Sequence, residues 1–94
     1  MTEIVINHKG TNYHVQVKEV FASDSLVRYE VTAGAKTLLL DRGNKEKIFK
    51  RRWKIVSFNW HFKDNKAAAQ FIHEIMVQID LDVKAKSSNS TENP

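Results

Sequence analysis

Two stretches of alternating apolar and polar residues, followed by one apolar stripe at helical spacing, constrain this fold more than any other feature. Residues 4–17 and 27–40 alternate with period two, which is typical of strands that bury one face. After Asp64, a candidate N-cap, apolar residues recur at three and four positions from Lys66 to about Lys84. This order predicts an α+β fold, with an antiparallel sheet of four to five strands and one C-terminal helix packed on one face.

The first alternation indicates a β-hairpin with its turn in residues 9–12. A four-residue loop would place His8 opposite Tyr13. A two-residue loop at Lys9 and Gly10 would shift the pairing by two residues and leave the same side chains on each face. The apolar face is therefore better determined than the register.

The second alternation indicates another hairpin, whose turn is centred on Gly34 and Ala35. Glycine at the first central position suits a type II′ turn, because only glycine adopts a positive φ there without strain. This turn predicts that Val31 lies opposite Leu38.

A further aromatic strand is expected over residues 53–58, after a long loop over residues 45–52. Period-two alternation places apolar side chains on both of its faces. The two faces carry Trp53, Ile55 and Ser57 on one side, and Lys54, Val56 and Phe58 on the other.

The chain of 94 residues has room for one domain, which we expect over residues 1–85, with a disordered polar tail at residues 86–94. One helix, ~10 Å wide, covers only about three strands spaced ~4.8 Å apart. Part of a five-stranded sheet would remain uncovered. A symmetric homodimer would cover it, and we therefore expect one.

The sequence contains no cysteine, which excludes disulfides, thiolate zinc sites and a thiol nucleophile. Its first residues do not resemble a signal peptide, and no stretch reaches the ~18 apolar residues that span a bilayer. These observations favour a cytoplasmic protein without a membrane partner.

Catalytic and metal-binding motifs are not recognisable. The histidines stand at scattered positions, without the spacing of a metal site or a nucleophile–base pair: His8, His14, His61 and His73. The three glycines suit turns rather than a phosphate-binding loop. We therefore expect a non-enzymatic binding module with no catalytic residue, no metal and no cofactor.

Positive charge is concentrated in residues 45–54, where six basic residues and one acid give a local charge of +5, against +4 for the whole chain. Aromatic residues are interleaved with this segment and follow it. Basic and aromatic residues together are typical of surfaces that bind single-stranded nucleic acid. The segment 45–62 is therefore a candidate site for single-stranded nucleic acid or another polyanion.

In this hypothesis the basic side chains neutralise phosphates, and an exposed aromatic ring, from Trp53, Trp60 or Phe49, stacks on a base. The candidate nucleic-acid-binding residues are Lys47, Phe49, Lys50, Arg51, Arg52, Trp53, Lys54 and Trp60. The alternative is that the aromatics are core residues and the basic loop is only a solvated surface. The module would then bind a protein, for example an acidic one, or form a homodimer.

The order of elements in residues 4–17, 27–40 and 66–83 resembles the ββββα repeats of the Pur-alpha and whirly single-strand-binding proteins. Residues 45–62 depart from that four-strand plan. The resemblance implies a nucleic-acid-binding function, and no individual site residue is assigned from it.

Overall fold

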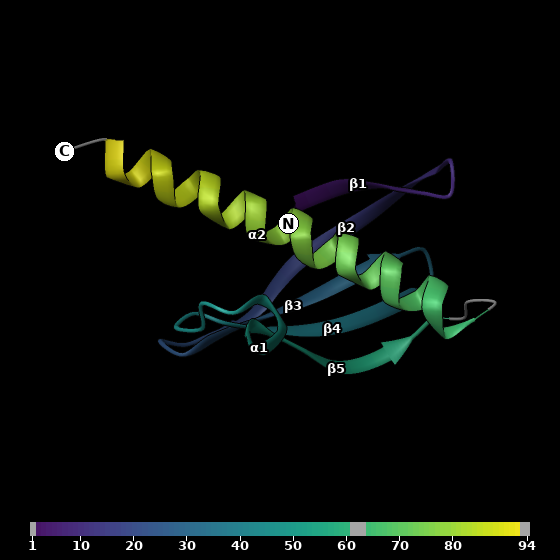
Figure 1. The fold of residues 1–94 in the computed structure, drawn as a ribbon, viewed down its shortest axis with the longest axis horizontal. Coiled ribbons are helices and arrows are strands. Elements are labelled where there is room, and N and C mark those ends of the chain that lie inside the picture. Colours follow the sequence, from purple (N-terminus) through teal and green to yellow (C-terminus); the bar gives the residue numbers. More distant parts are fainter. Residues whose placement is uncertain (1, 61–63, 93–94) are drawn as a thin grey trace. The chain divides into compact units, whose positions relative to one another are not determined.

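A computed structural model describes residues 2–60 and 64–92 (Figure 1). The chain forms two structural units, residues 1–61 and residues 62–94. The first unit holds a five-stranded antiparallel sheet, and the second is one long helix. The predicted α+β class, with antiparallel strands and a single C-terminal helix, is confirmed.

The sheet has the simplest antiparallel order, β1-β2-β3-β4-β5, so that β1 and β5 form its two edges. A one-turn helix, α1, lies between the last two strands in the sequence. The elements of this unit are β1 (Thr2–His8), β2 (Thr11–Ala22), β3 (Leu26–Ala33), β4 (Lys36–Gly43), α1 (Phe49–Arg52) and β5 (Trp53–Asn59).

The first hairpin has a two-residue turn. Lys9 and Gly10 have φ angles of 53° and 80°, as a type I′ turn requires at both central positions. His8 therefore lies opposite Thr11, and Ile6 lies opposite Tyr13. The structure thus selects the shorter of the two loops that the sequence allows, and the apolar face is the expected one.

The second hairpin has the predicted register. Gly34 has a φ of 62°, and Val31 lies opposite Leu38. Glycine is required at this position because the left-handed backbone is strained for most other residues.

One face of the sheet is buried. Side chains directly opposite each other on neighbouring strands share a face, and the buried members of this one are Ile6, Val15, Val17, Tyr29, Val31, Leu38, Leu40 and Trp53. The other face, here called the polar face, carries Arg28, Glu30, Asp41 and Lys54. Alternation in the sequence thus predicts the two faces correctly for residues 4–17 and 27–40.

The prediction for β5 is wrong beyond Ile55, because of a β-bulge. Ile55 lies opposite Leu40, but Ser57 lies opposite Leu39, so that Val56 is an extra residue in the ladder. The bulge reverses the alternation, and Phe58 lies on the same face as Ile55 rather than with Lys54.

The second unit is α2 (Asn65–Glu92). Asp64 caps its first turn, because the amide of Ala67 donates a 2.7 Å hydrogen bond to Asp64 Oδ1. Its buried side chains recur at helical spacing and are Ala67, Phe71, Ile72, Ile75, Met76 and Ile79. The helix continues past the end that the sequence predicts near Lys84. A single domain over residues 1–85 and disorder of residues 86–94 stay predictions.

Candidate nucleic-acid interface

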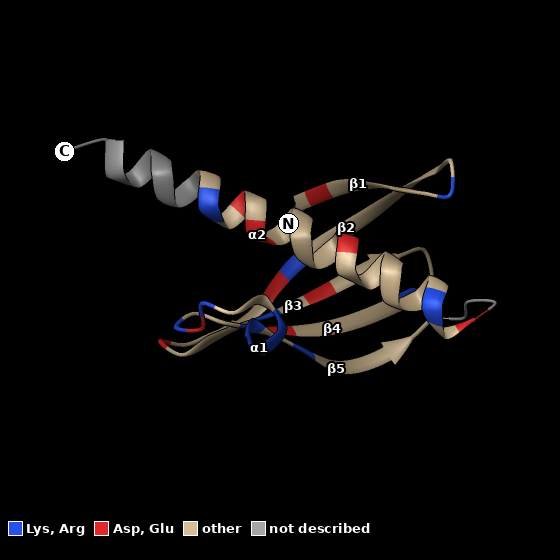
Figure 2. Cartoon of the chain, viewed as in Figure 1, with Lys and Arg blue, Asp and Glu red and all other residues tan. Residues whose placement is uncertain are grey.

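The basic segment begins where β4 ends. The sequence predicts a loop over residues 45–52, whereas the structure forms α1 within it: the amides of Arg51 and Arg52 each donate to the carbonyl of Ile48 at 3.0 Å. This turn brings three consecutive basic side chains, beginning at Lys50, to one end of the sheet (Figure 2). The positive charge that is clustered in the sequence is therefore clustered in space.

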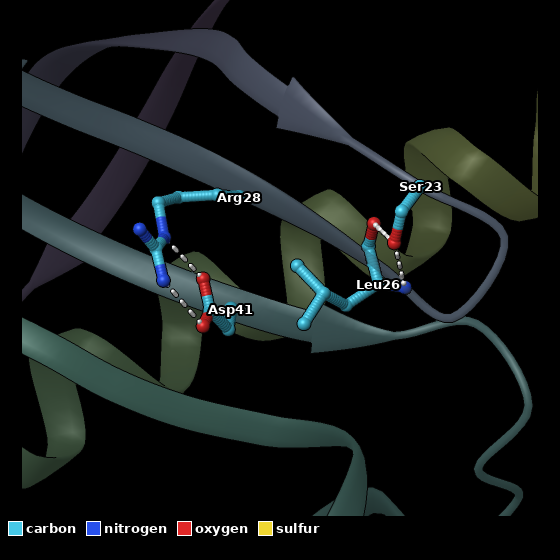
Figure 3. A network of polar contacts seen from close by, with 4 residues as sticks. All are labelled: Ser23, Leu26, Arg28 and Asp41. Atoms are coloured by element: carbon cyan, nitrogen blue, oxygen red, sulfur yellow. Dashed lines mark hydrogen bonds and ion pairs between the residues drawn. The ribbon is translucent and has the colours of Figure 1, made fainter.

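The loop that precedes α1 is held to the turn between β2 and β3. The side-chain amide of Asn44 donates to the carbonyl of Ser23 at 3.0 Å, and the Asn44 backbone amide donates to the carbonyl of Ser25 at 2.8 Å. That turn is itself closed by the Ser23 hydroxyl, which accepts a 3.2 Å hydrogen bond from the amide of Leu26 (Figure 3). Two segments about twenty residues apart thus form one surface.

Arg52 fixes the same loop from its other side. Its Nε donates to the carbonyl of Glu46 at 3.2 Å, and its Nη2 donates to the carbonyl of Lys47 at 3.1 Å. At least two of the five guanidinium donors are therefore used on the backbone. The sequence predicts Arg52 as a phosphate contact, and in the structure it shapes the loop that carries other cations.

A hollow of about 390 Å³ lies beside this loop, at the end of the polar face. Four basic residues and two acids are among its lining residues, which are Ser25, Leu26, Asp41, Gly43, Lys45, Glu46, Arg51, Arg52 and Lys54. We call it the basic hollow. Its volume falls in the range of about 300–1,000 Å³ that is usual for sites binding small ligands.

Some of the predicted basic site residues line the basic hollow, and others do not. Arg51, Arg52 and Lys54 line it, whereas Lys47 and Lys50 are exposed and do not. Lys45 lines it and is absent from the residue list predicted from the sequence, although it belongs to the same charge cluster. Residues 61 and 62 of the predicted segment lie outside the described residues.

The carboxylate of Asp41, on the wall of the hollow, is paired with Arg28. Arg28 lies directly opposite on β3, and its Nε and Nη2 donate to the two carboxylate oxygens at 2.7 and 3.0 Å (Figure 3). The hydrogen bond, followed by the charge of Asp41, raises the pKa of Arg28 above its ordinary value. Arg28 therefore stays cationic across the pH range in which proteins fold.

This pair occupies the acid that lies directly across from Lys54. Lys54 lies directly opposite Asp41 on the other side of β4, but both carboxylate oxygens accept hydrogen bonds from Arg28. Among the described side chains, those of residues 2–60 and 64–85, no ion pair joins Lys45, Arg51 or Lys54 to a carboxylate. Three cations at the hollow are thus available to an external anion.

The two tryptophans of the predicted site are buried. Trp53 is 8% exposed, with its ring centroid 6.2 Å from that of Tyr29, and Trp60 is 6% exposed, with Lys36 Nζ 6.0 Å from its ring centroid. A base stacks only on a ring with an open face. The structure therefore brings together the cations of the predicted site but buries both tryptophan rings, so that neither ring has an open face for stacking.

Phe49 is half-buried, and the exposed phenylalanines of the described sheet unit are Phe21 (53%) and Phe58 (43%). Phe21 precedes the basic segment by more than twenty residues, so composition around the charge cluster does not reveal it. A bulge in β2 determines which face of the sheet Phe21 occupies.

Other kinds of site are not found in the described part of the chain. Among its residues, no group of three histidine, cysteine or carboxylate side chains is placed to hold a metal ion. No described helix has the length and apolar character needed to cross a membrane. His61, one of the scattered histidines, lies outside the described residues.

Comparison with known proteins finds no family model, no curated protein and no solved structure that matches the chain. The resemblance in element order to the Pur-alpha and whirly proteins therefore stays a prediction.

Proposed function

We propose that this protein is a non-enzymatic module that binds single-stranded nucleic acid, or another polyanion, at the basic hollow. One observation carries the proposal: Lys45 from the loop, Arg51 from α1 and Lys54 from β5 line one hollow, and no carboxylate among the described side chains forms an ion pair with them. Because the loop is anchored by Asn44 and Arg52, the backbone that carries Lys45 and Arg51 is held in place before a ligand arrives.

Binding of this kind depends strongly on salt. Each phosphate neutralised on a single strand contributes a slope of about −0.7 to the plot of log affinity against log salt. Three contacts therefore predict a slope near −2, and a loss of about twentyfold in affinity between ~50 and ~200 mM salt. Phosphate contacts from other exposed lysines would make the slope steeper.

The proposal is tested by titrating the protein into a fluorescently labelled single-stranded oligonucleotide at these two salt concentrations. We expect anisotropy to rise at ~50 mM salt and the affinity to fall steeply at ~200 mM. The label is needed because both tryptophans are buried and their emission would not report stacking. No rise in anisotropy at ~50 mM salt, with micromolar protein, would contradict the proposal.

Substitutions in the Arg28–Asp41 pair should change oligonucleotide affinity in opposite directions. Asp41→Asn removes a negative charge from the wall of the hollow and should raise the affinity by about two- to fivefold, as expected for a partly exposed charge. Arg28→Ala leaves Asp41 to pair with Lys54 and should lower the affinity by a similar factor. The same titration at ~50 mM salt measures both, and changes of the same sign would contradict the assigned role of the pair.

The edge strand β5 favours a second candidate function, homodimerisation. Three of its apolar side chains are exposed, namely Ile55 (46%), Val56 (38%) and Phe58 (43%). An apolar edge strand is a template for pairing with another strand, and antiparallel pairing of two identical edges is symmetric about a two-fold axis. A second copy on β5 would continue the sheet and cover these side chains.

Light scattering tests this candidate directly. We expect a dimer at high micromolar concentration, and a shift towards monomer when Val56→Lys places a charge at the centre of the edge. Ser57→Lys in the same strand controls for added charge, because Ser57 is a polar residue that lies on the polar face. A wild-type protein that remains monomeric at these concentrations would rule out the β5 dimer, without affecting the proposed anion site.

A further inference from the structure

A second β-bulge places an aromatic ring on the polar face of the sheet. In β2, Glu19 lies opposite Tyr29 on the buried face, but Phe21 lies opposite Arg28, so that Val20 is an extra residue. Regular alternation would have kept Phe21 on the same face as Glu19. The bulge instead moves the phenyl ring to the face of Arg28, where it is 53% exposed.

Phe21 is the first member of a row that runs across this face to the basic hollow. Arg28, Asp41 and Lys54 follow it as successive cross-strand neighbours on β3, β4 and β5. Three strand spacings of ~4.8 Å separate Phe21 from Lys54, a distance of about 14 Å. All four residues belong to one structural unit, so the sheet itself fixes this separation.

A single exposed apolar side chain is ordinary on a protein surface. Phe21 differs because its ring shares a face, and a cross-strand row, with Lys54, for which the described side chains provide no ion-pair partner. Single strands are bound by this combination of aromatic rings and basic groups, since every base has a face that can stack. The exposed ring of Phe58 does not share a face with Lys54, because it lies on the opposite face of the sheet.

We infer that Phe21 stacks on an unpaired base of a strand whose phosphates occupy the basic hollow. The strand runs over the polar face from β5 to β2, across the Arg28–Asp41 pair. This inference rests on the proposed function and narrows it, because it makes the ligand single-stranded nucleic acid rather than a polyanion without bases. Phe21 also replaces the buried tryptophans as the stacking residue.

The test compares Phe21→Ala with Phe58→Ala on two probes, a single-stranded oligonucleotide and inorganic polyphosphate. Both rings are exposed, so neither substitution removes a core residue, and circular dichroism checks that each variant folds. Phe21→Ala should weaken oligonucleotide binding by about tenfold, a typical value for one stacked base. It should leave polyphosphate binding unchanged, and Phe58→Ala should change neither.

A third variant, Phe21→Trp, should keep oligonucleotide affinity at or above the wild-type value, because the larger ring also stacks. Its new indole is exposed, so its emission should change when the oligonucleotide binds.

Three outcomes would overturn the inference, and they separate it from the proposed function. If Phe21→Ala binds the oligonucleotide as tightly as the wild type, the stacking role is wrong while the anion site stands. If Phe21→Ala weakens the binding of both probes equally, the ring stabilises the sheet and does not stack on a base. If the wild type binds neither probe at ~50 mM salt, the proposed function fails as well.

Discussion

Replacing Lys45, Arg51 and Lys54 together by alanine is expected to lower the affinity for a single-stranded oligonucleotide by about a hundredfold or more at ~50 mM salt. These side chains line one hollow and form no ion pair with a carboxylate in the described part of the chain, so each is available to a phosphate. The slope of log affinity against log salt should become less steep by about 2. Anisotropy titrations at several salt concentrations measure both quantities.

The charge-matched control for this experiment compares Lys9→Asn with Lys54→Asn. Lys9 lies in the turn between β1 and β2, at the end of the sheet opposite the basic hollow. Its φ of 53° is one that asparagine tolerates, so the substitution preserves the turn. Lys9→Asn should change affinity by less than about twofold, and Lys54→Asn by several-fold. Equal losses would mean that net charge, rather than the hollow, determines binding.

Leu38→Ala is expected to lower the free energy of unfolding by about 3 kcal/mol. Leu38 is completely buried, on an inner strand between β3 and β5, and its loss would leave a cavity in the apolar face. Denaturation in urea, followed by circular dichroism, measures this change.

The neighbouring residue provides the matched control for the face assignment. Leu39 lies opposite Ser57 on the polar face and is only half-buried. Leu39→Ala removes the same atoms and should cost less than about 1 kcal/mol. Equal costs for the two substitutions would contradict the register of β4.

The regular parts of the fold are predictable from the sequence because their residues carry local signals. Gly34 marks the second hairpin, and Asp64 marks the start of α2. The two bulges are not predictable, because Val20 and Val56 are ordinary strand residues and nothing in their type indicates an extra position. Each bulge changes which face the following aromatic residue occupies.

The candidate site is predictable only as a cluster of charge. Its shape depends on contacts between distant segments, such as Asn44 with Ser23 and Arg28 with Asp41, which composition does not reveal. The sequence leaves the burial of Trp53 as one of two alternatives, since alternation gives β5 apolar residues on both faces. The neighbouring strands decide that Trp53 is buried.

The most direct test of the basic hollow as the binding site is an NMR titration of the uniformly ¹⁵N-labelled protein with a single-stranded oligonucleotide at ~50 mM salt. We expect the largest amide shift changes in residues 44–54, at Ser25 and at Phe21. Shift changes confined to β1 or α2, or no changes at all with the oligonucleotide in excess, would contradict binding at the basic hollow.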